Sequence, residues 1–109
     1  MDRLRGPRTR AAVANGLVVA EHLWRTAPGE DVGILTPRRA EIVSGTNLAR
    51  WAERVRLGAH VRLGRGEQTT GGRAKESVLA TALEAVLGVV YLEGGLAAAG
   101  RAIARLAAW

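Results

Sequence analysis

Residues 71–95 read GGRAKESVLATALEAVLGVVYLEGG, in which a basic, glycine-containing loop leads into a strongly apolar segment. Alanine, leucine and valine recur there at helical spacing and predict a helix from about Ala74 to Leu92. The sequence Glu93-Gly94-Gly95 predicts the end of this helix, because glycine is the usual residue just beyond a helix C-terminus. Apolar side chains lie on most sides of the helix, so we expect it to be buried nearly all round.

A carboxylate, Glu84, interrupts this apolar helix. A narrow and less apolar stripe contains Ser77, Thr81, Glu84 and Gly88, which share a face because they are three or four residues apart. A charge on a buried helix needs a partner, a metal ion or a proton. Glu84 is therefore a candidate metal ligand and catalytic base, and the alternative is a salt-bridged structural carboxylate. Thr81, one turn earlier, is neutral, whereas two-metal phosphodiester chemistry needs several converging carboxylates.

The rest of the 109-residue chain also has helical spacing, and no segment shows the alternation of a strand. An all-α fold is expected, with further helices at about Arg10–Arg25, Pro37–Val43, Asn47–Arg56 and Leu96–Ala107. Thr36-Pro37 predicts the start of the second of these, as an N-cap followed by proline at the first helical position.

The apolar positions of two helices predict part of the core. Residues three and four apart lie on one helix face, and an apolar stripe of this kind usually packs inward. The stripe of the first helix contains Val13, Leu17, Ala20 and Trp24, and that of the third contains Leu48, Trp51, Ala52 and Val55.

The chain is basic, with 16 Lys and Arg against 10 Asp and Glu and a net charge of +6. Nearly all the cations are arginine, which suits phosphate contact, although a GC-rich genome would give the same bias. Candidate RNA-binding residues cluster before and at the start of the long helix: Arg62, Arg65, Arg73 and Lys75. The alternative for these cations is a solvated basic loop.

Several classes of site and location are not supported by the sequence. There is no cysteine, which excludes disulfides and thiolate metal sites and fits a cytoplasmic protein. We expect no membrane partner, because no run reaches the roughly 20 apolar residues of a membrane span. His22 and His60 have no partner at metal-binding spacing and are expected to be surface or capping residues.

Several blocks of the sequence resemble the ribonuclease III endonuclease domain. The resemblance extends over roughly Gly16 to Leu106 and is most specific in its second half. Its motifs are GLVVAEHL at 16–23, RA at 39–40, IVS at 42–44, LA at 48–49, LGRGE at 63–67, GGR at 71–73, KESVLATALEAVLG at 75–88 and YLEGG at 91–95.

This resemblance implies an all-helical, homodimeric domain that cleaves double-stranded RNA with Mg²⁺. The family's acidic pair falls on Thr81 and Glu84, so the aspartate is replaced and the glutamate is retained. The family's signature, Glu-Arg-Leu-Glu-Phe-Leu-Gly-Asp, falls on residues 5–12, which read RGPRTRAA. Every carboxylate of that signature is absent here, and two acidic positions are arginine.

The resemblance divides the chain into a non-matching basic segment, 1–12, and a ribonuclease III-like domain, 13–109, without the family's leading helices or a double-stranded-RNA-binding domain. Apolar surface exposed by the missing helices is expected to cause dimerisation or poor solubility. Arginine in place of carboxylates disfavours Mg²⁺, and a lone Glu84 cannot hold it.

We therefore expect a catalytically impaired protein of double-stranded RNA processing that acts by binding RNA or by dimerising. One alternative is an active Mg²⁺-dependent endonuclease whose site is completed by Asp31, Glu41 or a partner chain. The other is a structural interaction domain that does not bind RNA.

Overall fold

The computed structural model describes residues 7–61, 72 and 75–109. In chain order its elements are α1 (Pro7–Thr26), α2 (Val32–Ile42), α3 (Gly45–Arg54), the short 3₁₀ helix η2 (Leu57–His60) and α5 (Glu76–Ala107). The described residues contain no strand, and the expected all-α fold is confirmed.

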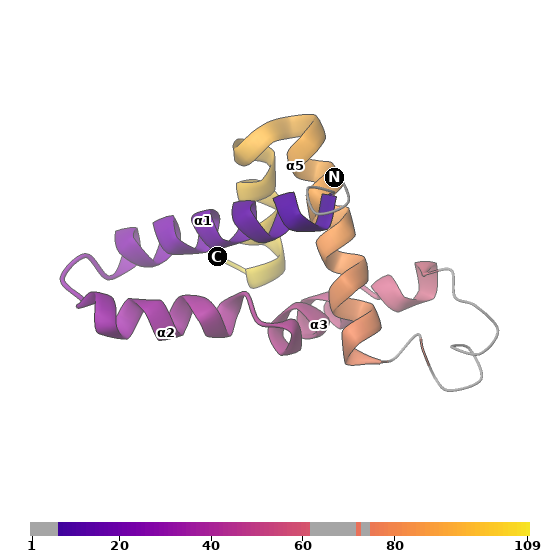
Figure 1. Ribbon diagram of the computed structural model, residues 1–109, viewed down its shortest axis with the longest axis horizontal. Coiled ribbons are helices and arrows are strands. Elements are labelled where there is room, and N and C mark those ends of the chain that lie inside the picture. Colours follow the sequence, from indigo (N-terminus) through magenta and orange to yellow (C-terminus); the bar gives the residue numbers. More distant parts are fainter. Residues whose placement is uncertain (1–6, 62–71, 73–74) are drawn as a thin grey trace.

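Helix α5 organises the fold. In Figure 1, α1 and α2 lie side by side in opposite directions, and the first half of α5 crosses the N-terminal end of α1. The chain then folds back, and the second half of α5 runs in the opposite direction to the first half and crosses α1. The most extensive contacts between elements are those of α5 with α1 and with α3. Both halves of α5 are thus fixed by segments far away in the sequence.

The fold-back occurs at Gly95, where φ is 72° and ψ is −168°. This backbone conformation is essentially restricted to glycine, so α5 consists of two helices joined at that residue. A side chain on the preceding Gly94 would also clash, because its Cβ would lie 2.5 Å from the Cβ of Ala98. The predicted helix end at residues 93–95 is confirmed.

The core lies between the two halves of α5 and the inner faces of α1 and α3. Its buried hydrophobic residues are Ala11, Val19 and Leu23 of α1, Leu48, Ala49, Trp51 and Ala52 of α3, and Leu79, Ala80, Leu83, Leu87 and Ile103 of α5. Three of the core positions predicted for α3 are confirmed, namely Leu48, Trp51 and Ala52. Val55, the fourth, is half-exposed and follows the helix as its C-cap.

The predicted core face of α1 was wrong. Val13, Leu17 and Trp24 are 70%, 52% and 67% exposed, while α5 covers the opposite face, which includes Val19 and Leu23. Helix α1 has apolar residues on both faces, so helical spacing alone could not indicate which face α5 would cover.

Helix α2 begins earlier than predicted. Its N-cap is Asp31, whose side chain accepts a hydrogen bond from the backbone N–H of Gly33 at 3.1 Å. Pro37 lies inside the helix, and Thr36 is not the cap. An aspartate cap satisfies a backbone donor at the helix start, which outweighs the preference of proline for the first helical position.

The first half of α5 is buried on one face only, so the expectation of burial nearly all round was wrong. Leu79, Leu83 and Leu87 point into the core, whereas Val86 and Val89 are about half-exposed. By length and composition α5 could cross a membrane. Its break at Gly95 and the core contacts of its leucines instead identify it as the central helix of the domain.

Candidate functional site

The candidate site is the stripe on the first half of α5 that contains Glu84. Helix α3 begins beside this part of α5, since a Cβ on Gly45 would lie 3.9 Å from the Cβ of Ala80. Along the stripe, Ser77 is exposed, Thr81 and Glu84 are half-buried, and Gly88 is buried. The stripe therefore runs along the boundary between the core and solvent.

Glu84 reaches solvent and does not need a charged partner. Within residues 7–61, 72 and 75–109 its carboxylate makes no hydrogen bond or ion pair. The prediction from sequence assumed a fully buried charge, which would require compensation, but water can solvate a partly exposed carboxylate. The role of Glu84 as a metal ligand and catalytic residue stays a prediction.

The described residues do not form a Mg²⁺ site by themselves. Mg²⁺ takes hard oxygen ligands, and catalytic sites of this kind need converging carboxylates. No group of three or more His, Asp or Glu side chains among the described residues is placed to hold a metal. Asp31, considered as a contributing ligand, instead caps α2, and Thr81 offers only a neutral oxygen beside Glu84.

One polar contact near the start of α5 was not predicted from the sequence. The Thr46 hydroxyl of α3 donates a hydrogen bond to the Glu76 carboxylate of α5 at 2.8 Å. Ser44 caps the same end of α3 by accepting from the N–H of Asn47 at 3.2 Å. The starts of α3 and α5 are thus joined by side-chain hydrogen bonding. The two residues of the Thr46–Glu76 pair are 30 positions apart, and nothing in the local sequence signals their contact.

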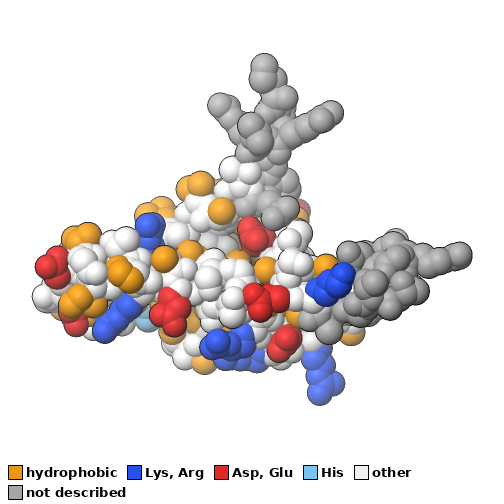
Figure 2. All heavy atoms as spheres, turned by 60° about the horizontal axis from the view of Figure 1, so that its bottom comes forward, with side chains coloured by type: hydrophobic (Ala, Val, Ile, Leu, Met, Phe, Trp, Pro, Cys, Tyr) orange, Lys and Arg blue, Asp and Glu red, His pale blue; other side chains and the backbone are white. Residues whose placement is uncertain are grey.

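Most of the predicted RNA-binding residues lie outside the described part of the chain. Arg62, Arg65 and Arg73 fall there, whereas Lys75 is exposed immediately before α5. On the face shown in Figure 2, acidic and basic side chains are interspersed and no broad area carries a single charge. The described residues therefore supply no large basic surface on that face.

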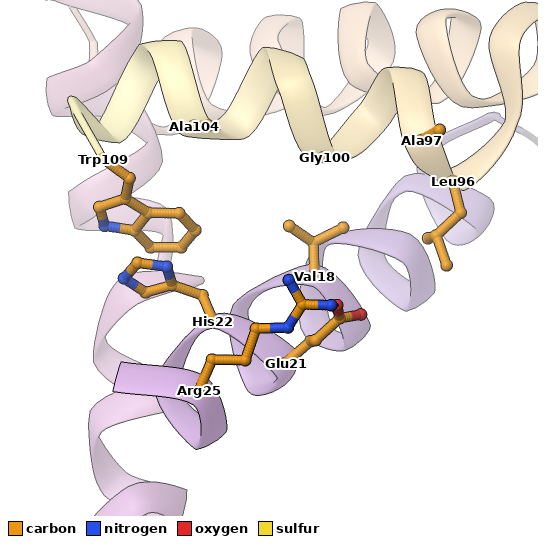
Figure 3. A pocket seen from close by; sticks show the side chains of 9 residues that line it. All are labelled: Val18, Glu21, His22, Arg25, Leu96, Ala97, Gly100, Ala104 and Trp109. Carbon is orange, nitrogen blue, oxygen red and sulfur yellow. The ribbon is translucent and has the colours of Figure 1, made fainter. Parts of the chain in front are cut away.

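A cavity of about 500 Å³ lies between α1 and the second half of α5, beyond the Gly95 break from Glu84. Figure 3 shows the indole of Trp109 stacked on the imidazole of His22, with Arg25 and Glu21 beside them. His22, which was expected to be a surface or capping residue, is partly exposed and makes this ring contact. The contact holds the C-terminal residue against α1.

The all-helical fold agrees with the fold that the resemblance of the sequence motifs implied. A family model described as Ribonuclease-III-like matches residues 11–108. The chain belongs to the ribonuclease III family.

Relatives within the ribonuclease III family support this assignment at the level of sequence. The chain is 50% identical over 91 residues to ribonuclease 3 of Heliobacterium modesticaldum, covering 84% of this chain and 39% of the relative. It is also 50% identical over 91 residues to ribonuclease 3 of Streptomyces coelicolor, covering 84% of this chain and 33% of the relative. The chain thus spans less than half the length of these ribonuclease III relatives.

The fold agrees with a solved ribonuclease III structure. The nuclease domain of ribonuclease III from Campylobacter jejuni superposes with a TM-score of 0.88 at 31% identity, over 92% of this chain and 70% of that chain. The Campylobacter jejuni domain shows structural flexibility in a region involved in dimer formation. The described helices therefore correspond to a ribonuclease III nuclease domain.

Proposed function

We propose that this ribonuclease III-like domain acts in double-stranded RNA processing in the cytoplasm, that it binds duplex or structured RNA as a homodimer, and that its own cleavage activity is impaired. The family and the nuclease-domain fold support the RNA substrate class. We infer the impaired cleavage from the environment of Glu84. Its stripe contains Thr81 one turn earlier and no second carboxylate.

The catalytic step that would be impaired is the activation of water by Mg²⁺. A Mg²⁺ ion bound at carboxylates would supply a nucleophilic hydroxide and stabilise charge on the phosphate. The described oxygens around Glu84 do not fit such an ion and therefore support no catalytic step through it. Glu84 retains one acidic position of the family's pair.

A binding titration tests the proposed RNA interaction. We expect the protein to bind a duplex RNA more tightly than a single strand of the same sequence. The affinity should fall steeply between about 50 and 200 mM salt, because phosphate contacts release counterions. Duplex binding without salt dependence, or no binding, would instead favour a structural interaction domain that does not use RNA.

Two charge-reversal variants test whether Lys75 contacts the RNA. Lys75→Glu, at the start of α5, should weaken duplex binding about tenfold, since it turns a phosphate contact into a repulsion. Arg101→Glu makes the same change in charge on an exposed residue of the second half of α5. It should leave the affinity close to that of the unmodified protein. Equal losses in both variants would show a non-specific effect of net charge.

An active endonuclease completed by a second chain is the other candidate. It is favoured by the partly exposed position of Glu84, where carboxylates from another chain could approach. Mg²⁺-dependent cleavage of duplex RNA that is lost in Glu84→Ala would establish this alternative.

A further inference from the structure

A hollow of about 520 Å³ lies between α1 and α2. Its apolar lining consists of Leu17, Ala20, Leu23 and Trp24 of α1 and Leu35 of α2. Three polar residues also line it, namely Glu21, Thr36 and Arg39. Cavities that bind small ligands commonly measure about 300–1,000 Å³, so this hollow can hold a molecule of that kind. In Figure 1 the pair of α1 and α2 extends to one side of the molecule, whereas α5 begins beside α3 on the other side.

Trp24 supplies an uncommitted aromatic ring to the hollow. The residue is 67% exposed, and it makes no stacked ring contact with the other described residues. An exposed indole beside a cavity can stack on a planar group that enters it. Every nucleobase has such a planar face, and proteins commonly hold unpaired bases by stacking them on aromatic side chains.

Arg39 supplies a cation that lacks a partner. Its guanidinium reaches from α2 to α1, because its Nη1 atom lies 3.7 Å from the position that a Cβ on Gly16 would occupy. Within residues 7–61, 72 and 75–109 this guanidinium makes no hydrogen bond or ion pair. Its donors are therefore available to the oxygens of a phosphate group, which a guanidinium binds in a fixed fork.

The carboxylate that lines the hollow is already neutralised. Glu21 pairs with Arg25 at 2.6 Å, so it opposes an anion at Arg39 less than an isolated carboxylate would. The ion pair leaves carboxylate lone pairs that can accept from a ribose hydroxyl or a base amino group, and the exposed Thr36 hydroxyl can donate or accept. A purely apolar occupant would desolvate these polar side chains without compensation. The lining thus favours an occupant with a planar ring, hydroxyl groups and an anion.

We propose that the hollow between α1 and α2 binds one unpaired nucleotide of a structured RNA, with its base against Trp24 and its phosphate at Arg39. Residues 16 and 24 are eight positions apart on α1, or about 12 Å at 1.5 Å per residue, which a base, a ribose and a phosphate in line can bridge. The inference rests on the proposed RNA binding and adds to it a contact separate from Lys75 at the start of α5.

Binding of adenosine 5′-monophosphate tests the hollow without duplex RNA. Calorimetric titration should show saturable binding, and ribose 5-phosphate, which lacks the base, should bind about tenfold more weakly. Trp24→Ala should weaken the nucleotide about tenfold, and so should Arg39→Gln, because it removes charge-assisted hydrogen bonds. Arg38→Gln is the matched control, since this exposed arginine of α2 does not line the hollow, and it should bind like the unmodified protein. Equal affinity for the two phosphates, or equal losses in Arg38→Gln and Arg39→Gln, would overturn the proposal.

A single-stranded extension tests the hollow within RNA. A duplex with an extension of about six nucleotides should bind about tenfold more tightly than the blunt duplex, and Trp24→Ala should remove this gain without changing the affinity for the blunt duplex. An extension that adds no affinity would overturn the nucleotide site while duplex binding still supports the proposed function. Binding of adenosine 5′-monophosphate without binding of the blunt duplex would overturn the proposed duplex interaction and leave the nucleotide site standing.

Sedimentation equilibrium tests whether a protein surface covers the hollow instead. Trp24→Ala should have the same association state as the unmodified protein, because the proposed occupant of the hollow is a nucleotide. A Trp24→Ala variant that dissociates into monomers, yet binds adenosine 5′-monophosphate with unchanged affinity, would overturn the nucleotide site.

Discussion

The indole of Trp109 lies flat on the imidazole of His22, with ring centroids 3.5 Å apart and planes within 2° of each other. The backbone N–H of Trp109 also donates to the carbonyl of Ala104 at 2.9 Å, so the end of the chain is held by both a ring contact and a hydrogen bond. The second half of α5 is thereby fastened to α1, beyond the Gly95 break from the Glu84 stripe.

Removing this stack should destabilise the domain. His22→Ala is expected to lower the free energy of unfolding by about 1 kcal/mol, the usual contribution of an aromatic pair. The matched control is His60→Ala, which truncates the other histidine of the chain at an exposed position of η2. Urea unfolding at equal protein concentration measures both variants. Equal effects in the two would show that the ring contact contributes nothing.

The helix break at Gly95 should tolerate no side chain. Gly95→Ala is expected to cost about 1–3 kcal/mol of unfolding free energy, because φ of 72° with ψ of −168° is strained for any residue with a Cβ. Gly100→Ala places the same methyl group in open space within a helix and should be neutral or stabilise by about 0.5–1 kcal/mol. Thermal melts of the two variants should therefore shift in opposite directions, and a stable Gly95→Ala protein would refute the strained break.

Asn15 is a buried polar residue among hydrophobic neighbours on its helix. It is buried in α1, and its Oδ1 atom has no hydrogen-bond partner among the described residues. Asn15→Leu should raise the free energy of unfolding by about 1 kcal/mol or more, because it removes an unsatisfied buried acceptor. Asn47→Leu is the contrasting variant, since the Asn47 amide donates to the carbonyl of Ile42 at 2.7 Å and its loss should destabilise. A destabilised Asn15→Leu protein in urea unfolding would show that the Oδ1 atom is satisfied in solution.

An arginine joins the ends of α3 and α5. The guanidinium of Arg54 donates to the carbonyl oxygen of Leu106 at 2.7 Å, near the C-terminus of α5 where carbonyls lack helical partners. Arg54→Ala should cost about 0.5–1 kcal/mol of unfolding free energy. Arg50→Ala, one turn earlier on the same helix, should change stability by less than about 0.5 kcal/mol. A similar loss in both variants, measured by urea unfolding, would assign the effect to net charge.

Local sequence predicted the parts of the fold that depend on local chemistry. The helical spacing of residues 71–95 and the glycines at 94 and 95 were sufficient to predict the long helix and its break. The same was true of the apolar stripe of α3, most of which is buried as expected. The start of α2 was missed because the Thr36-Pro37 pair was read as the cap, whereas the helix begins five residues earlier with Asp31 as its N-cap.

Features that depend on tertiary contact could not be predicted in this way. Val13 and Val19 are equally apolar and lie on the same helix, yet one is exposed and the other is buried, because α5 covers only one side of α1. The Thr46–Glu76 hydrogen bond and the His22–Trp109 stack join residues that are distant in sequence. The half-buried position of Glu84 likewise depends on how the other helices pack against α5, which the spacing of its stripe does not indicate.

Duplex RNA cleavage tests the central claim, namely that Glu84 without a second carboxylate cannot support Mg²⁺-dependent hydrolysis. The protein in excess over a labelled duplex RNA, with and without Mg²⁺, should be compared with its Glu84→Gln variant at a salt concentration where both bind RNA. We predict that the two proteins give the same background level of cleavage and that Mg²⁺ adds nothing. Mg²⁺-dependent cleavage by the unmodified protein that disappears in Glu84→Gln would contradict the account.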